Sequence, residues 1–346
     1  MPASFVHDVP AQRVVFAPGA ANRLGEEVAR LAWRRAFVIA TAGSGARLGA
    51  RIVALLGGVA AGLHAEAVIH VPRAVADAGL AAAKRAAADG LVAVGGGSAI
   101  GLAKAIALAT DLPIIALPTT FSGSEATPIY GTTEGERKLT GRDWRVLPKV
   151  VIYDSDLSAG LPSAAAAASG MNAIAHCVEG LWIAERTPVT VALASKALRL
   201  FSAHLPRAVT HGDDRDARGQ CLIAAWLAGT VLTAGTGLHH KLAHVLGGLG
   251  LPHAETHAVI LPHVTRFNLA EAPEAHERLA SLLSTDDPAA ALASLLQRFP
   301  IPQRLRDVGF ERGKIIDVAQ QVATLGITHP RPATAEAIEM LLTEAY

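Results

Sequence analysis

The chain has 346 residues, which is long for a single hydrophobic core and predicts two domains. Hydrophobic residues make up 51% of the chain and charged residues 18%, a balance that excludes an intrinsically disordered protein. The formal net charge is +1 and no long basic run is present, which excludes nucleic acid as a partner.

Short apolar runs alternate with helical patterns through the first half of the chain. In chain order we expect a strand at 36–41, a helix at 46–57, a strand at 65–71, a helix at 75–89, a strand at 91–94, a helix at 100–110, a strand at 114–117, a hairpin over 129–139 and a strand at 149–153. Strands and helices that alternate in this way are typical of a parallel, doubly wound sheet.

The pattern changes beyond Asp156, where strand-like runs become scarce and Ala- and Leu-rich helical segments continue to Tyr346. The alanine run at 164–168 is interpreted as the start of a helix, because a helix-compatible segment follows it. We therefore predict an α/β nucleotide-binding domain over 1–157 and an all-α catalytic domain over 158–346.

The sequence predicts neither a membrane span nor a disulfide framework. No uninterrupted apolar run reaches the roughly 18 residues of a membrane span, and residues 1–10 lack the apolar core of a secretion signal. Cys177 and Cys221 are the only cysteines, which is typical of a reducing compartment. We expect a cytoplasmic protein that has no membrane partner.

The strand expected at 91–94 runs directly into Gly95-Gly96-Gly97-Ser98 and then into a helix. Glycines let the backbone approach an anion closely, and the free N–H groups at a helix start point toward it. The spacing departs from the usual dinucleotide fingerprint, because Ile100 stands where that pattern has glycine. On this motif alone, a Gly-rich strand-to-helix turn is the alternative to a pyrophosphate site.

A second polar segment, LPTTFSGSE at 117–125, follows the next expected strand. The carboxyl ends of adjacent parallel strands open onto the same crevice, so both loops can bind one ligand. A polar turn that caps the next helix is the alternative. Two such loops after successive strands favour a nucleotide site.

Histidines gather between Gly170 and His263, which hold nine of the 14 in the chain. Asn172 and His176 are four residues apart, so they share a helix face. His240 and His244 have the same spacing. A single buried histidine is more typically a core group than a catalytic one, but this clustering predicts one polar pocket.

Five segments together resemble the iron-containing alcohol dehydrogenase family: LVAVGGGSAIGLAKAIAL, ALPTTFSGSEATPIYGTTEGERK, LPKVVIYDSDLSAGLP, GMNAIAHCVEGLW and HHKLAHVLGGLGLPHAETHAVILPHV. Their order and spacing extend the resemblance from about Val15 to the C-terminus. The resemblance implies a Rossmann-like N-terminal domain, a helical C-terminal domain and a cleft that holds a nicotinamide cofactor. It also implies a homodimer.

The resemblance implies roles for individual residues. The pyrophosphate would be bound by Gly96, Gly97 and Ser98, and the nucleotide and nicotinamide cleft would be lined by Thr119, Thr120 and Ser122, with Lys138 reaching the cofactor. The family's metal-binding histidines correspond to His176, His240 and His253, and its additional pocket histidine corresponds to His244.

Three departures from the family pattern change what it implies. Asn172 stands where the family has a metal-binding aspartate, and an amide is a poor ligand for a divalent cation, so we expect no bound metal. Gly101 replaces the aspartate of the family's GGGSxxD pattern. No acidic residue lies in Thr41-Ala42-Gly43, where it would meet the adenosine ribose, so NADPH is expected to serve beside NADH.

Within the family, HHKLAHVLGG and GGGSAIGLAK resemble members that reduce an enone double bond of a small dicarboxylate during the breakdown of aromatic compounds. Hydride addition to an enone leaves an enolate, which is easier to stabilise than the alkoxide of an alcohol dehydrogenase, so imidazoles and an amide can suffice. The expected hydrogen-bond donors are Asn172, His176, His240 and His253, and His244 is the expected proton donor.

Other assignments stay open. His239, His257 and His263 are interpreted as structural groups, and Cys177 as a core residue. The candidates for binding the substrate carboxylates are Arg137, Arg142, Arg145 and Lys241. The alternative functions are a metal-dependent alcohol or aldehyde dehydrogenase, a lyase similar to dehydroquinate synthase, and a nucleotide-binding sensor without turnover.

Overall fold

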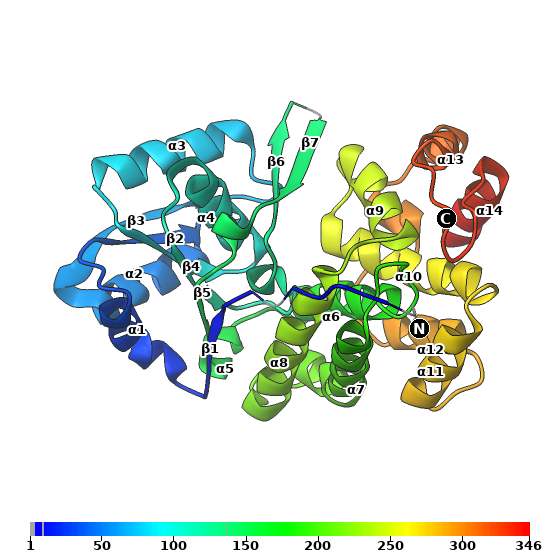
Figure 1. Ribbon diagram of the computed structural model, residues 1–346, viewed down its shortest axis with the longest axis horizontal. Coiled ribbons are helices and arrows are strands. Elements are labelled where there is room, and N and C mark those ends of the chain that lie inside the picture. The colour runs from blue at the N-terminus through cyan, green and yellow to red at the C-terminus, as the bar shows by residue number, and fades with distance from the viewer. Residues whose placement is uncertain (1–3, 9, 136) are drawn as a thin grey trace. The chain divides into compact units, whose positions relative to one another are not determined.

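The computed structural model describes residues 4–8, 10–135 and 137–346, except for the side chains of Arg137 and Lys138. It divides into two compact units (Figure 1). The α/β unit contains the described residues of Asp8–Leu161 together with Asp213–Gly229. The helical unit contains Pro162–Gly212 and Thr230–Tyr346, with the described residues among Met1–His7.

A six-stranded sheet forms the centre of the α/β unit in the described part of the chain, with the strand order β1-β8-β5-β4-β2-β3. Each neighbouring pair is parallel. The strands are β1 (Arg13–Phe16), β2 (Ala36–Thr41), β3 (Ala60–Ala67), β4 (Gly90–Gly95), β5 (Ile114–Pro118) and β8 (Val150–Tyr153). The predicted parallel sheet is therefore confirmed.

Helices cover both faces of this sheet. Successive residues of a strand point to opposite faces, so the apolar residues of each strand are divided between two helical layers. Val38 and Val92 point toward the layer of α1 (Leu24–Arg30) and α2 (Ser44–Leu56). Ile39 and Leu91 point toward the layer of α3 (Arg73–Arg85) and α4 (Gly97–Thr110). Figure 1 shows the two helical layers with the sheet between them. Strands buried on both faces explain the nearly continuous apolar runs of β2, β4 and β5.

Two elements of the α/β unit differ from the prediction. The strand expected at 65–71 is β3, which begins five residues earlier and ends at Ala67. The apolar residues Val68 and Ile69 are exposed, and the chain then turns through positive φ angles at His70 and Val71. β1 was not predicted, because this four-residue edge strand buries only Val15 fully. A strand with one buried residue leaves no periodic signal.

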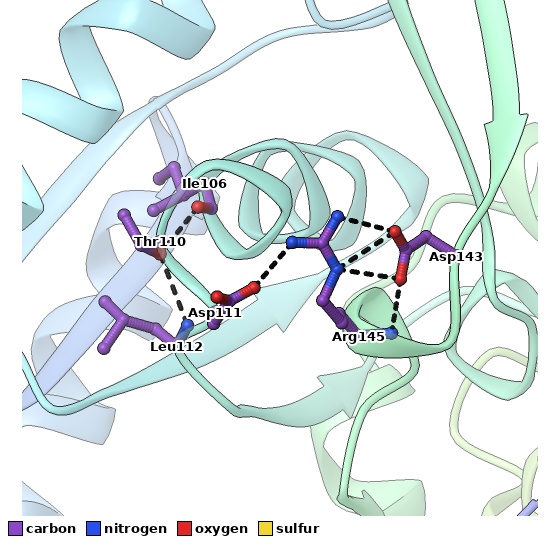
Figure 2. A network of polar contacts seen from close by, with 6 residues as sticks. All are labelled: Ile106, Thr110, Asp111, Leu112, Asp143 and Arg145. Atoms are coloured by element: carbon purple, nitrogen blue, oxygen red, sulfur yellow. Dashed lines mark hydrogen bonds and ion pairs between the residues drawn. The ribbon is translucent and has the colours of Figure 1, made fainter.

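An antiparallel hairpin, β6 (Ile129–Glu134) and β7 (Arg137–Arg142), follows the loop after β5, as predicted. Arg145, just beyond the hairpin, donates to Asp111 at the end of α4 and to Asp143, both at 2.7 Å (Figure 2). Its guanidinium is therefore already paired with two carboxylates. A substrate carboxylate would have to compete with these two partners, and Arg145 stays a candidate for the substrate carboxylates.

The second half of the chain is helical, as predicted. The helices are α5 (Ser155–Ser158), α6 (Ser163–Glu179), α7 (Pro188–Thr210), α8 (Arg215–Leu232), α9 (Leu238–Gly248), α10 (His253–Leu269), α11 (Pro273–Leu283), α12 (Pro288–Gln297), α13 (Ile315–Ala323) and α14 (Ala335–Ala345). The alanine run 164–168 lies in the first turns of α6, where the sequence predicted a helix start. In the helical unit, α6 packs against α7 and α10, and α10 also contacts α9 and α14.

No helix in the described ranges is both long enough and apolar enough to cross a membrane.

Gly229 in α8 lies against the loop that follows β5. A Cβ at this position would meet the carbonyl oxygen of Gly123 and would lie 2.9 Å from Cβ of Ala126. We expect Gly229→Ala to lower the free energy of unfolding by about 1–3 kcal/mol, the range for an overpacked contact. Gly25→Ala, in α1, is the control, because a Cβ at this position would meet no atom within 4 Å. This substitution should stabilise the protein slightly. Urea unfolding of both variants tests this, and an undiminished stability of Gly229→Ala would contradict it.

Candidate active site

The glycine-rich loop joins β4 to α4 in the α/β unit. Gly95 has a φ of 140°, a conformation that side-chain-bearing residues rarely adopt. Gly96 is the N-cap of α4, and no side chain caps the helix start. The first amides of α4 are therefore left for an anion, and the helix dipole favours a negative charge there.

The second predicted loop lies beside the first. Gly95 pairs with Pro118 at the ends of β4 and β5, and the amide of Thr119 donates to the carbonyl of Gly95 at 3.0 Å. A Cβ on Gly96 would lie 2.7 Å from Cγ2 of Thr120, so only glycine fits there. The hydroxyls of Thr120 and Ser122 are 3.4 Å apart. The two loops therefore form one polar surface at the carboxyl edge of the sheet.

This surface contains six of the seven predicted cofactor residues, namely Gly96, Gly97, Ser98, Thr119, Thr120 and Ser122. The seventh, Lys138, has its side chain outside the described part of the chain. Gly97 would meet no atom within 4 Å if it carried a Cβ, so the backbone there is open to a ligand. Uncapped amides, hydroxyls and an open glycine fit the pyrophosphate and ribose of a dinucleotide.

The histidine cluster lies in the helical unit, on three helices. α6 carries Asn172 and His176 on one face, and α9 carries His240 and His244 one turn apart. α10 begins at His253, which completes the set of predicted catalytic residues. Helical spacing therefore placed Asn172, His176, His240 and His244 correctly on their elements, whereas it made no prediction for His253.

The imidazoles of the cluster lie in contact with one another. The ring centroids of His176 and His240 are 4.9 Å apart, those of His240 and His257 4.9 Å, and those of His253 and His257 4.5 Å. His244 and His253 are stacked at 6.3 Å. Both His244 and His253 are half-buried, whereas His176, His240 and His257 are buried. The half-buried pair is the accessible side of the cluster.

His239 and His257 form a hydrogen-bonded pair within the cluster. Nε2 of His239 lies 2.9 Å from Nδ1 of His257, and both side chains are almost fully buried. The interpretation of these two residues as structural groups agrees with their burial. His263 lies apart, with Nδ1 3.9 Å from a carboxylate oxygen of Glu344.

Glu179, at the end of α6, was not predicted as a site residue. Its carboxylate is buried and accepts a 2.7 Å hydrogen bond from the amide of His239. Its other oxygen lies 2.5 Å from Nδ1 of His240. Because a carboxylate only accepts, Nδ1 of His240 carries the proton. Glu179 therefore holds both the first turn of α9 and the orientation of the His240 ring.

The protonation of the cluster follows from burial. Burial lowers the pKa of His176 and His257 well below the usual value, and neighbouring imidazoles act in the same direction. Burial raises the pKa of Glu179, but His240, His239 and the Gly237 amide outweigh it, so the pKa of the carboxyl is lowered. His176 and His257 are thus neutral at pH 7, and the carboxylate of Glu179 in the same cluster is ionised.

The sequence does contain a signal for Glu179. It follows His176 by three residues and Asn172 by seven, so all three share one face of α6. A carboxylate on the same helix face as two predicted catalytic groups is a candidate for orienting a histidine.

The donor set of the cluster does not fit a metal ion well. Among the described residues, no group of three or more His, Cys, Asp or Glu side chains is placed to hold one. Asn172 offers an amide oxygen where a charged ligand would be needed, and Glu179 is already bound to His240.

Both thiols are unavailable for chemistry. Cys177 and Cys221 are fully buried, and burial raises the pKa of each thiol far above its usual value. The prediction of Cys177 as a core residue is therefore confirmed. Arg142 lies over the ring of Trp144, 5.0 Å from its centroid.

Comparison with known proteins gives two family matches. Residues 11–155 match the family described as iron-containing alcohol dehydrogenase, and residues 166–346 match the C-terminal part of the Fe-containing alcohol dehydrogenase family. The two matches together cover the α/β fold and nearly all of the helical half.

Full-length relatives match as well. Maleylacetate reductase 2 from Cupriavidus pinatubonensis is 47% identical over 96% of this chain and 94% of its own. A maleylacetate reductase from Pseudomonas sp. strain P51 is 42% identical over 99% of this chain and 98% of its own. The crystal structure of maleylacetate reductase from Agrobacterium tumefaciens has a TM-score of 0.95 and 40% identity, covering 100% of this chain and 99% of that one.

The buried histidines predict that the protein loses stability in mild acid. Burial lowers the pKa of His239 to about 3 in the folded chain, whereas an unfolded histidine titrates near 6.5. Between these pH values the unfolded state binds more protons. The stability is therefore complete above about pH 6.5 and falls toward pH 3, by about 1.4 kcal/mol per pH unit for each such histidine.

Urea unfolding between pH 8 and pH 5 measures this slope. His239→Asn should reduce the slope, whereas His211→Asn, at an exposed position, should leave it unchanged. A free energy of unfolding that stays constant from pH 7 to pH 5 would contradict the prediction.

Glu179→Gln should lower the free energy of unfolding by about 1–3 kcal/mol, because an amide cannot accept from both His239 and His240 in this geometry. Glu277→Gln, at an exposed position of α11, is the matched control. Guanidinium unfolding of the two variants makes the comparison. Equal stability of Glu179→Gln and the wild type would show that the carboxylate does not hold α9.

Proposed function

The chain belongs to the iron-containing alcohol dehydrogenase family, and from this premise we propose that it is a maleylacetate reductase. The proposed reaction is the NAD(P)H-dependent reduction of the enone double bond of maleylacetate to 3-oxoadipate, a step in the breakdown of aromatic compounds. Similarity to maleylacetate reductases over the full length of the chain supports it.

The observation that carries the proposal is the composition of the cluster, in which imidazoles and an amide replace a charged metal site. The reduced nicotinamide supplies a hydride. Reduction of a double bond conjugated to a ketone places negative charge on the ketone oxygen, and that charge needs hydrogen-bond donors. The cluster offers such donors on three helices that pack together.

Each residue has a proposed role. Asn172 and His176, from α6, and His253, from α10, donate hydrogen bonds to substrate oxygens. His240 does the same through Nε2 when its ring carries both protons, because its Nδ1–H is already donated to Glu179. Nε2 of His240 is buried and has no hydrogen-bond partner among the described residues, as expected of a group that awaits a ligand.

His244 is proposed as the proton donor. It is one helical turn beyond His240 on α9 and is half-buried, so it can exchange protons with solvent. An enolate becomes the saturated ketone when a carbon atom receives this proton. Glu179 is a positioning residue in this scheme, since it acts only through His240 and α9.

The reaction is proposed to proceed without a bound metal. The support is chemical: Asn172 is a weak ligand, and the buried carboxylate nearby is already bound to His240. An enolate requires less stabilisation than the alkoxide of an alcohol dehydrogenase, which makes a set of imidazole and amide donors sufficient.

NADH and NADPH are both proposed as cofactors, because the stretch Thr41-Ala42-Gly43 after β2 has no carboxylate to repel a ribose phosphate. A homodimer and a cytoplasmic location are proposed with it. Two buried, unpaired cysteines support a reducing compartment.

One observation favours a second candidate, a metal-dependent alcohol or aldehyde dehydrogenase. The family's three histidine positions are occupied by His176, His240 and His253. A carboxylate on the second nitrogen of a histidine, as Glu179 is on His240, is also a common arrangement behind metal ligands.

Turnover of maleylacetate by chelator-treated protein, followed by NADH oxidation, tests the proposal. We expect full activity after metal removal is verified by elemental analysis. Activity that returns only with Zn²⁺ or Fe²⁺ would favour the metal-dependent enzyme. Substrate conversion without net NADH consumption would favour a lyase.

Asn172→Asp and Asn172→Leu separate the two candidates further. Both variants should lower the metal-free kcat by about 10²–10³-fold. Asn172→Asp adds a negative charge that repels the developing charge, and Asn172→Leu removes a hydrogen-bond donor near it. Asn172→Asp alone should then bind Zn²⁺ tightly in a calorimetric titration. Undiminished metal-free activity in both variants would remove Asn172 from the mechanism.

A further inference from the structure

We propose that the ammonium of Lys104 is a positioning group for the nucleotide site, because it ties the helix that begins at the phosphate-binding loop to the loop that carries the hydroxyls. This inference rests on the proposed use of NAD(P)H. It concerns the α/β unit alone.

Lys104 lies on α4 and is buried, with 1% of its surface exposed. Its Nζ donates to the carbonyls of Ser124 at 2.7 Å, Thr127 at 2.8 Å and Ile129 at 2.7 Å. The hydroxyl of Thr127 lies 3.1 Å away. An ammonium has three N–H groups, so three short contacts to carbonyls use them fully.

Lys104 connects two segments that both belong to the proposed nucleotide site. It follows Gly97, the first residue of α4, by seven residues on a rigid helix. Its three carbonyl partners lie in the segment 124–129, which begins two residues after Ser122. One side chain therefore fixes the distance between the helix-start amides and the hydroxyl loop.

The acceptors around Nζ require a side chain with several donors. Burying a charge costs several kcal/mol unless it is fully hydrogen-bonded, and an apolar residue on α4 would fill the same volume but leave three carbonyls without this donor. Glu125, next to the Ser124 acceptor, is completely buried; burial raises the pKa of its carboxyl, which accepts from the hydroxyl of Tyr153 at 2.8 Å. The backbone carbonyl of Glu125 also accepts from Gln12 at 2.9 Å.

Opposing effects act on the protonation of Lys104. Burial lowers the pKa of Lys104 to about 7, and Glu125 acts in the opposite direction. Three carbonyl acceptors favour the form with three donors, so the ammonium is the state that the geometry selects.

The test is a fluorescence titration with NADH on the full chain. Lys104→Met should raise the Kd for NADH about tenfold or more, the size expected for lost hydrogen bonds to a charged group. The KM for maleylacetate at saturating NADH should change by less than about twofold. An unchanged Kd would overturn the proposal.

Arg218→Met is the matched control. Arg218 is a second buried cation of the same unit, and it donates to the carbonyls of Ser158 and Leu161, away from the hydroxyl loop. It should lower thermal stability and leave the Kd for NADH unchanged. Equal increases in Kd for Arg218→Met and Lys104→Met would indicate general destabilisation and would overturn the proposal.

Thr127→Val keeps the proposal testable if Lys104→Met does not fold. It preserves shape but removes the hydroxyl that lies 3.1 Å from Nζ of Lys104 and donates to the carbonyl of Ser124 at 3.2 Å. The segment that Lys104 holds is thereby loosened, so the Kd for NADH should rise by a smaller factor. If Lys104→Met cannot be obtained, an unchanged Kd for NADH in a folded Thr127→Val variant would overturn the proposal. A wild-type protein that binds neither NADH nor NADPH would instead overturn the proposed function, and this inference with it.

Discussion

The arrangement of the proposed catalytic residues depends on one buried carboxylate, that of Glu179. A buried anion is tolerated only when donors surround it, and here the donors are the backbone start of α9 and the ring of His240. The same contacts that compensate the charge therefore orient an imidazole. Because α9 also carries His244, and His240 packs against rings from α6 and α10, this carboxylate constrains groups on three helices.

The α/β unit also contains a buried charge that is held by backbone groups, but here the charge is positive. Lys104 is a buried cation whose partners are backbone carbonyls, just as the partners of Glu179 include a backbone amide. A fully satisfied polar network inside a protein is rigid, because any movement leaves a buried group without a partner. Each unit thus places a rigid charged contact beside the groups proposed to bind a ligand.

The sequence predicted most of the fold, and the reasons for its failures are local. β2, β4 and β5 are buried on both faces and left clear apolar runs, whereas β1 buries one residue and left none. Helical spacing placed Asn172 and His176 on one face of α6. It did not find Glu179, although this residue shares that face, because its contacts join α6 to α9 across some 60 residues of sequence and only the folded structure shows this pairing.

The burial of both thiols has a practical consequence for experiments. With Cys177 and Cys221 fully enclosed and their pKa values raised, almost no thiolate is present to react with maleimides or iodoacetamide. A cysteine engineered at any exposed site would be the sole reactive thiol in the native chain. Fluorophores and spin labels can therefore be attached at chosen positions without first replacing the natural cysteines.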